Sequence, residues 1–379
     1  MSIGLLFFAS LPALLALGYL LLIAWALRAW EKVPPPQPFS PERLPQATIL
    51  LPARNEAAHI DNCIKHLLQQ NYPPERLSIL VIDDHSTDNT AALAAKYRSP
   101  RLSLLPLSDE QAGKKAAIEA GAAHAKSPVL LTTDADCEPP PGWAKTMVSY
   151  LEAYQLQAVS GPVCFKKPAS ALQRFQALDF TGMMILTAAG LETRTWIMGN
   201  GASLAYRRPA FEAVNGYEGN RHRASGDDVF LLTKLNQHYP GQVGFLPAAS
   251  ASVLTPPAPD WPSFVQQRLR WGTKNIEAAT RFWTVLALGL VFLLCWAIIL
   301  SLALSACFGG GAILLFAGLL GAKAAADYRL LRASTRFFGE PGLLRGFWKS
   351  ELLHTAYIAG IGLISLLGRQ YRWKGRKRH

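Results

Sequence analysis

Long apolar runs near both ends of the chain limit what it can fold into more strongly than any other feature of the sequence. Residues Ile3–Leu27 are almost entirely apolar, and a helix of about 25 residues is roughly 37 Å long, enough to cross a bilayer. A signal peptide would begin with charged residues and have a shorter apolar core. Here Arg28, Trp30 and Lys32 follow the run instead, as expected at a membrane interface. We therefore expect residues 1–32 to form a retained transmembrane anchor.

Apolar segments return at residues 281–368. Phe282–Ala306 and Ala312–Ala326 are candidate spans, and Leu352–Leu367 is a weaker third candidate. If basic residues remain in the cytoplasm, two spans return the chain to that side, and a third would put the basic tail at residues 369–379 outside. The third segment is therefore re-entrant or interfacial, or the number of spans differs by one. Glu351 and His354 near its start favour a segment that does not simply cross lipid. The basic loop expected before it contains Arg329, Arg332, Arg336, Arg345 and Lys349.

The charge balance narrows the possible partners. The chain carries a formal net charge of +12, although only 17% of its residues are charged. Both nucleic acid and anionic membrane surfaces attract basic residues. The positive charge gathers around the apolar segments and in the tail, which indicates a membrane and argues against nucleic acid. The five cysteines include no Cys-x-x-Cys pair, so we expect neither a disulfide framework nor a zinc site.

Between the apolar ends, the sequence is typical of a soluble α/β domain. A proline-rich linker at residues 33–45 leads to residues 46–280, where short apolar strands alternate with helical stretches. The strands are apolar throughout, which is typical of parallel strands buried on both faces. The expected strands are Thr48–Leu51, Leu77–Ile82 and Val129–Thr133, and the expected helices are Glu56–Gln70 and Asn89–Tyr97.

Acidic residues follow the expected strands, where an open α/β sheet places its ligands. Asp83 and Asp84 come directly after a buried strand, whereas Asp88 is explained as a helix cap. Asp134 and Asp136 follow the strand Val129–Thr133. Two carboxylates two residues apart in an extended segment point to the same side, and they can hold a hard divalent cation whose other positions a diphosphate fills. The alternative is an acidic turn before a run of prolines.

A third acidic pair, Asp227 and Asp228, opens an expected helix. Ser225 as N-cap, with Asp228 three residues later, gives a start that resembles a capping box. A carboxylate held in a first helical turn is also well oriented to act as a base. Lys114 and Lys115 start an amphipathic helix after a glycine, either as solvated lysines or as cations facing an anionic ligand.

Basic and aromatic residues lie about ten residues before the second apolar run. The segment Gln267–Trp271 contains Arg268 and Arg270. These residues are either interfacial anchors or an arginine fork for phosphate beside an aromatic platform.

Taken together, the motifs resemble those of membrane-bound family 2 glycosyltransferases. That family has the GT-A fold, a Rossmann-like α/β nucleotide-diphospho-sugar transferase domain, here flanked by transmembrane helices. Five motifs occur in the family's order: Leu51–Glu56 resembles the strand and loop that cradle the nucleoside, Val81–Ser86 the first aspartate motif, Asp134–Asp136 the metal-binding Asp-x-Asp, Gly226–Asp228 the Thr-Glu-Asp type motif, and Gln267-x-x-Arg270-Trp271 the motif of cellulose and hyaluronan synthases and ceramide glucosyltransferases. Gly113 and Lys114 resemble the Gly-Lys that precedes the metal strand.

The resemblance implies a role for each matched residue. Asp228, with Asp227 beside it, would be catalytic and would deprotonate the acceptor hydroxyl, while Asp134 and Asp136 would hold Mg²⁺ or Mn²⁺. The residues that would bind the nucleotide sugar are Pro52, Ala53, Arg54, Asn55, Glu56, Asp83, Asp84, Lys114, Asp134, Ala135 and Arg270. Those that would bind the acceptor are Gly199, Asn200, Gly201, Gln267 and Trp271.

The activity implied is inverting, metal-dependent transfer of a sugar from a nucleotide sugar, most often a UDP-sugar, to a hydroxyl of a membrane lipid. The protein would be a multi-pass protein of the cytoplasmic membrane with its catalytic domain in the cytoplasm. Two departures from the family pattern are Glu119, where Asn is commoner, and Gly226, which replaces the usual Thr. The alternative is a processive polysaccharide synthase of the cellulose, hyaluronan or poly-N-acetylglucosamine type. The sequence has no Phe-x-Val-Thr-x-Lys segment and few C-terminal apolar segments, which favours a single transfer.

Overall fold

A computed structural model describes residues 3–221, 226–278, 282–308, 310–366, 371–373 and 376–378. The chain divides into two compact units. The sheet unit comprises Val33–Lys166 and Gly190–Pro256, and the helical unit comprises Met1–Lys32, Lys167–Ala189 and Pro257–His379. The helical unit thus includes two stretches that lie within residues 46–280 of the sequence.

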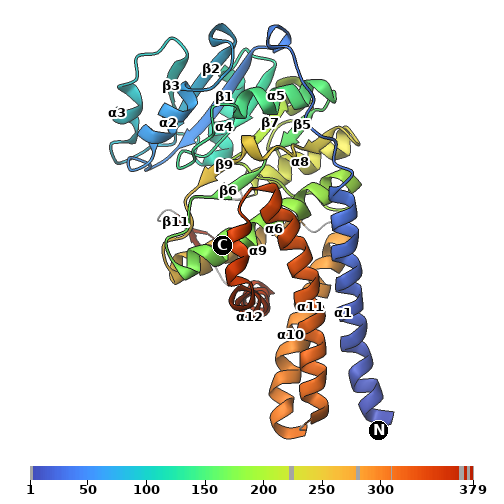
Figure 1. Cartoon of the computed structure of the whole chain (residues 1–379). Coiled ribbons are helices and arrows are strands. Elements are labelled where there is room, and N and C mark those ends of the chain that lie inside the picture. The colour runs from blue at the N-terminus through green and yellow to red at the C-terminus, as the bar shows by residue number, and fades with distance from the viewer. Residues whose placement is uncertain are drawn as a thin grey trace. The chain divides into compact units, whose positions relative to one another are not determined.

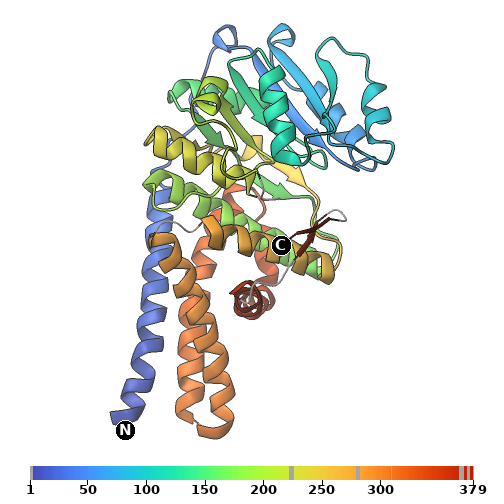
Figure 2. The ribbon, with the colours of Figure 1, turned by 180° about the vertical axis from the view of Figure 1, so that it is seen from behind.

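A seven-stranded mixed sheet forms the centre of the sheet unit, with the strand order β3-β2-β1-β4-β7-β5-β8. Strands β1 to β4 are parallel, β7 runs antiparallel to both β4 and β5, and β8 is parallel to β5. Figure 1 shows β3, β2 and β1 side by side, and Figure 2 shows the sheet from behind. The strands are β1 Ala47–Ala53, β2 Leu77–Asp83, β3 Leu102–Pro106, β4 Val129–Thr132, β5 Ala158–Ser160, β7 Leu204–Arg207 and β8 Val243–Phe245.

The predicted strands and their parallel pairing are confirmed. Almost every residue of β1 and all of β4 are buried, as expected for strands covered on both faces. The helix predicted from Glu56 begins later, at Ile60. The intervening residues form a loop in which Asn55 has a positive φ of 51° and the Ala57 N–H donates to the Asp88 carboxylate. These loop contacts take the place of the first helical turn.

Helices connect the strands of the sheet unit. They are α2 Ile60–Leu68, α3 Thr90–Ala95, α4 Lys114–His124, α5 Trp143–Ala153, α7 Arg208–Ala213 and α8 Asp227–His238, with short 3₁₀ turns at η1 Pro41–Arg43, η2 Pro74–Arg76 and η3 Ala249–Ala251. A second, two-stranded parallel sheet pairs β6 Val163–Phe165 with β9 Val253–Thr255.

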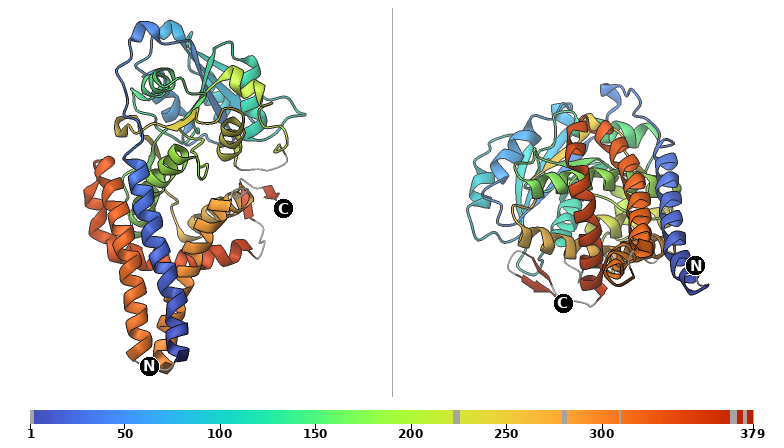
Figure 3. Two further views of the ribbon diagram at one scale, coloured as in Figure 1. Left: turned by 90° about the vertical axis from the view of Figure 1, so that its right-hand side faces the viewer. Right: turned by 60° about the horizontal axis from the view of Figure 1, so that its bottom comes forward.

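The helical unit contains three helices that are long and apolar enough to cross a membrane, over Ser10–Trp30, Phe282–Cys307 and Gly310–Phe337. The three helices lie side by side and run the length of the unit (Figure 3). In contrast, α12 lies crosswise, because Figure 1 shows it end-on while the three run in the plane of the picture. The elements are α1 Ile3–Trp30, α6 Ala171–Thr193 (its last four residues in the sheet unit), α9 Trp261–Ala278, α10 Phe282–Phe308, α11 Gly310–Phe337, η4 Pro341–Gly346, α12 Phe347–Leu366, β10 Tyr371–Trp373 and β11 Arg376–Arg378.

The basic loop predicted after Ala326 is in part helix, so this expectation was wrong. Arg329, Arg332 and Arg336 belong to α11, which continues to Phe337. Leucine, alanine and arginine are good helix formers, and the sequence offers no glycine or proline there before Gly339. Gly339 has a φ of +71° and ends the helix, as glycine commonly does after a helical C-terminus.

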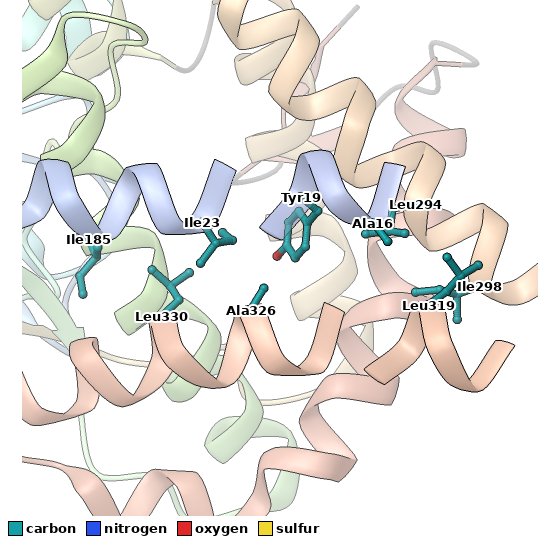
Figure 4. Close-up of a cluster of buried hydrophobic side chains, with 9 residues drawn as sticks. All are labelled: Ala16, Tyr19, Ile23, Ile185, Leu294, Ile298, Leu319, Ala326 and Leu330. Atoms are coloured by element: carbon teal, nitrogen blue, oxygen red, sulfur yellow. The ribbon is translucent and has the colours of Figure 1, made fainter. Parts of the chain in front are cut away.

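The core of the helical unit combines an apolar cluster with buried charges. Figure 4 shows side chains of α1, α6, α10 and α11 that pack against one another, including Tyr19 of α1. The Tyr19 hydroxyl donates to the carboxylate of Asp327. Lys323 is fully buried, and its Nζ lies 2.7 Å from oxygens of both Asp327 and Glu351. A buried cation thus holds carboxylates of α11 and α12.

Candidate active site

The carboxyl end of β4 brings four predicted site residues together in the sheet unit. Asp134 and Asp136 follow β4, Lys114 begins α4, and Asp227 begins α8. The Lys114 Nζ lies 2.6 Å from the Asp134 carboxylate and 3.1 Å from that of Asp227. Segments separated by about a hundred residues in the sequence therefore converge on one ammonium group.

Lys114 is held as a cation. Burial opposes its charged form, but the carboxylates of Asp134 and Asp227 outweigh this and keep the pKa of the ammonium group above its ordinary value. Its side chain is 20% exposed, so the interpretation of Lys114 as a fully solvated lysine was wrong. A partly accessible cation among carboxylates can exchange one of them for an incoming anionic ligand.

Asp134 and Asp136 form a group that fits a hard divalent cation. Their carboxylate oxygens and the Cys137 Sγ all lie within 4.8 Å of one another. Burial, followed by the nearby Asp136 and Asp134 charges, raises the pKa of the Cys137 thiol well above its ordinary value. The neutral thiol is a poor ligand, so the two carboxylates are the donors suited to Mg²⁺ or Mn²⁺. Ala135 between them is buried.

A glycine-containing loop, Gly199–Gly201, lies directly against this group. A Cβ at Gly201 would be 2.8 Å from the Lys114 Nζ and 2.9 Å from an Asp227 oxygen, so only glycine fits without displacing them. The Gly201 N–H donates to Asp228 at 3.2 Å, and its carbonyl accepts a hydrogen bond from the Thr132 hydroxyl. The loop predicted on the acceptor side thus contacts both Asp227 and Asp228.

Asp228 is 6% exposed and stands in the first turn of α8. Its carboxylate accepts hydrogen bonds from the N–H groups of Gly201 and Val229, at 3.2 and 2.8 Å. The residue at the N-cap is Gly226, with a φ of 79°. Ser225, which was predicted as N-cap, lies outside the described residues.

The loops after β1 and β2 are joined by hydrogen bonds. The Arg54 guanidinium donates to the Asp84 carbonyl at 2.8 Å, and the Asn55 side chain accepts from the Thr87 N–H. Asp84 is 3% exposed and accepts from the Gly113 N–H at 3.0 Å. Arg54 and Asn55 therefore join the loops after β1 and β2, and Asp84 holds the glycine that precedes Lys114.

Asp83 differs from Asp84 in its surroundings. One of its oxygens accepts from the Ser86 N–H. The other, Oδ1, is buried and has no hydrogen-bond partner among the residues that the structure describes. A buried carboxylate oxygen without a partner is costly, and a ligand hydroxyl or N–H would satisfy it. Pro52 and Glu56, also predicted to bind the nucleotide, are partly buried beside this loop, with the Glu56 N–H donating to Thr90.

Two residues of α4 anchor a neighbouring loop, and sequence reasoning assigned neither of them that role. Lys115 is 5% exposed and donates to the Asn220 carbonyl at 2.9 Å. Glu119 accepts from the Tyr217 N–H and pairs with Arg221 at 2.9 Å. Glu119, which departs from the family pattern, was the one sign in the sequence of a special role, but its partners Tyr217 and Arg221 are about a hundred residues away.

Gln267, Arg270 and Trp271 lie on α9 in the helical unit. Their neighbour on α9, Arg268, is a buried cation whose guanidinium pairs with Asp179 at 2.9 Å and lies 4.5 Å from the centroid of the Trp271 ring. Trp271 also packs near Phe180. Arg268 therefore orders this helix, and the phosphate and acceptor roles of Arg270, Gln267 and Trp271 stay predictions.

Comparisons with known proteins find relatives for a large part of this chain. Residues 48–214 match the model of Glycosyl transferase family 2. The chain is 28% identical over 189 residues to the glycosyltransferase AglE of Haloferax volcanii, with 49% of this chain and 60% of that protein covered. It is 27% identical over 251 residues to a β-monoglucosyldiacylglycerol synthase of Synechocystis sp., with 63% and 50% covered. The chain thus spans at most about 60% of the length of these relatives.

A solved structure resembles this one over nearly its whole length. The mannosyltransferase PcManGT from Pyrobaculum calidifontis, in complex with GDP-Man and Mn²⁺, superposes with a TM-score of 0.62 at 22% identity, covering 96% of this chain and 99% of that chain. The likeness confirms the predicted GT-A fold. Residues 48–214 of this chain therefore match a family 2 glycosyltransferase domain, and the chain has a GT-A fold.

Proposed function

We propose that the protein is an inverting, metal-dependent glycosyltransferase that moves a sugar from a nucleotide sugar to a hydroxyl of a membrane lipid. The observation that carries this proposal is the convergence of Lys114, Asp134 and Asp227 at the carboxyl end of β4, with Asp228 beside them. Cations offset the negative charge that builds up when a diphosphate leaves, and a neighbouring carboxylate can remove a proton from an attacking hydroxyl.

In this proposal each side chain has a distinct task. Asp134 and Asp136 hold a divalent cation, which supplies charge stabilisation for the diphosphate when bound. Lys114 contacts the diphosphate from the other side, and the buried oxygen of Asp83 binds the nucleoside. Asp228 deprotonates the acceptor hydroxyl. A single base opposite the leaving group gives in-line attack and inversion at the anomeric carbon.

The helical unit supports a membrane location. Trp30 at the end of α1 and Phe337 at the end of α11 are in edge-to-face contact, with ring centroids 5.0 Å apart. The basic residues near these two helix ends therefore lie at the same end of the unit, and the positive-inside rule assigns that end to the cytoplasm. Because α12 lies crosswise, the chain would cross the membrane only in α1, α10 and α11. These three crossings satisfy the positive-inside rule. A lipid acceptor agrees with the glycolipid synthase among the relatives.

The second candidate is a processive polysaccharide synthase. The chain is 26% identical over 144 residues to a poly-β-1,6-N-acetyl-D-glucosamine synthase of Staphylococcus aureus, but it covers only 34% of that protein. Product size separates the two functions, because one transfer gives a discrete glycolipid and repeated transfer gives a polymer.

The test uses the purified full chain in detergent. Panels of UDP-sugars and GDP-sugars are offered with Mg²⁺ or Mn²⁺ and a total lipid extract, and the products are analysed by mass. A lipid heavier by one sugar is the expected product, and a long heterogeneous product would establish the synthase instead. Asp136→Asn should lose metal-dependent donor binding, whereas Asp109→Asn, at an exposed position, should not. Absence of transfer and hydrolysis with every donor would contradict the proposal.

A further inference from the structure

A cavity of about 900 Å³ lies in the helical unit, apart from every residue discussed above as part of the sheet-unit site. Its walls come from the start of α6, the middle of α11, η4 and the start of α12. The volume is in the range of small-molecule sites. No residue of the proposed glycosyl-transfer machinery lines it, so it calls for a separate explanation.

Basic side chains form the charged part of this cavity. Arg174 of α6, Arg345 of η4 and Lys349 of α12 line it and are exposed. No carboxylate is among its lining residues, and within the described part of the chain none of the three has an ion-pair partner. A Cβ at Gly346 would lie 3.5 Å from the Arg174 Cδ, which shows that the arginine stem packs along this wall. Three unbalanced cations around one cavity indicate an anionic occupant.

Most of the remaining wall of the cavity is apolar, and small residues form part of it. Gly321, Ala324 and Ala325 come from α11, one of the three helices able to cross a membrane. A Cβ at Gly321 would meet no atom within 4 Å, so the space beside it is open. Tyr328 and Trp348 also line the cavity and are 42% and 63% exposed. Exposed aromatic rings beside basic residues are typical of the boundary between lipid and water.

We propose that this cavity binds one anionic phospholipid, with its phosphate among Arg174, Arg345 and Lys349 and an acyl chain along the small residues of α11. A charged rim next to an apolar floor matches a lipid that has both parts. We place this lipid apart from the sugar acceptor, because none of the residues proposed for glycosyl transfer lines the cavity. The inference rests on the proposed membrane location but not on glycosyl transfer.

The test is direct binding, measured by native mass spectrometry of the full chain in mixed micelles that contain phosphatidylglycerol or phosphatidylcholine. Each basic side chain near an anionic lipid contributes about 1 kcal/mol, or roughly fivefold in affinity. Replacing two of them, in Arg345→Gln/Lys349→Gln, should therefore weaken phosphatidylglycerol retention about thirtyfold. The matched control is Arg332→Gln/Arg336→Gln, which removes two exposed charges from α11 outside the cavity.

A second variant tests the apolar floor. Gly321→Leu adds a side chain to open space without changing charge, and it should reduce phosphatidylglycerol retention by at least fivefold. Equal retention of the two lipids by the unaltered protein, equal losses in both double variants, or full retention in Gly321→Leu would overturn the assignment. Complete displacement by glycerol 3-phosphate would also overturn it, since the ligand would then be a soluble phosphate compound. Each result is independent of whether the protein transfers sugar.

Discussion

The adjacent residues Asp227 and Asp228 have different partners, and this difference allows a sharp test of the proposed mechanism. The Asp227 carboxylate lies 3.1 Å from the Lys114 Nζ. The Asp228 carboxylate instead accepts two backbone N–H groups, from Gly201 and Val229. Asp228→Asn removes a base and a negative charge while it preserves the size of the side chain. It should therefore separate the chemical step from donor binding.

The structure sets the size of each effect. An asparagine has one acceptor oxygen, so Asp228→Asn loses one of two N–H bonds, or about 1 kcal/mol of stability. Loss of a negative charge from the first turn of α8 costs about 0.3–1 kcal/mol more. A total of about 1–2 kcal/mol leaves an ordinary domain folded. Loss of a general base, in contrast, lowers the rate of transfer about 10²–10⁴-fold.

The assay combines donor binding by isothermal titration calorimetry with transfer rates at saturating donor. Asp228→Asn should bind donor within about threefold of the unaltered protein and lose transfer by at least about a hundredfold. Asp227→Asn should retain more transfer and show its main effect in the placement of Lys114, hence in donor affinity. Near-normal turnover by Asp228→Asn would refute its assignment as base. If Asp227→Asn alone abolished turnover, the base would be the other aspartate of the pair.

Two further predictions concern positions where the structure leaves little freedom. Gly201→Ala should lower the rate of transfer at least about tenfold in initial-rate measurements, because the new methyl would stand 2.8 Å from the Lys114 Nζ. The control is Gly142→Ala, whose Cβ would lie 3.9 Å from its nearest neighbour. Its rate of transfer should be unchanged. Equal rates for the two variants would contradict this packing. Lys323→Met should destabilise the detergent-purified protein by about 3–5 kcal/mol in thermal unfolding, because it leaves two buried carboxylates without their cation. The exposed Lys32→Met is its control, and matching melting curves would show that the buried cation is dispensable.

Much of the sheet was predictable because its strands are short, apolar and separated by helical stretches. The same pattern placed Asp83 and Asp134 at strand ends, and the structure has them there. Local sequence carries this information, since a strand buried on both faces must be apolar along its length. The antiparallel strand β7, inserted between β4 and β5, was not predicted, because the pairing partner of a short strand depends on distant segments.

The rest of the site depends on contacts that no local pattern encodes. Nothing in the sequence near Lys115 or Glu119 indicates that they hold the loop that contains Tyr217 and Asn220. The sequence does not show which side chains the two glycines of the Gly199–Gly201 loop approach. Both glycines are required for steric reasons that only the fold reveals: a Cβ at Gly201 would meet Lys114 and Asp227, and a Cβ at Gly199 would meet Leu232.

The charged residues at the start of the third C-terminal segment are explained by their partner in the structure. Glu351 and His354 argued against a simple crossing by that segment, and Lys323 is an equally unfavourable residue within a candidate span. The structure pairs them: the Lys323 Nζ lies 2.7 Å from Glu351 and 3.1 Å from the His354 ring. The crosswise α12 therefore supplies a second carboxylate to a lysine that also pairs with Asp327 of its own helix, α11. Because Lys323 has a carboxylate from each helix, Glu351 depends on α11 for its cation more than Lys323 depends on α12, and removal of α11 should destabilise α12 more than the reverse.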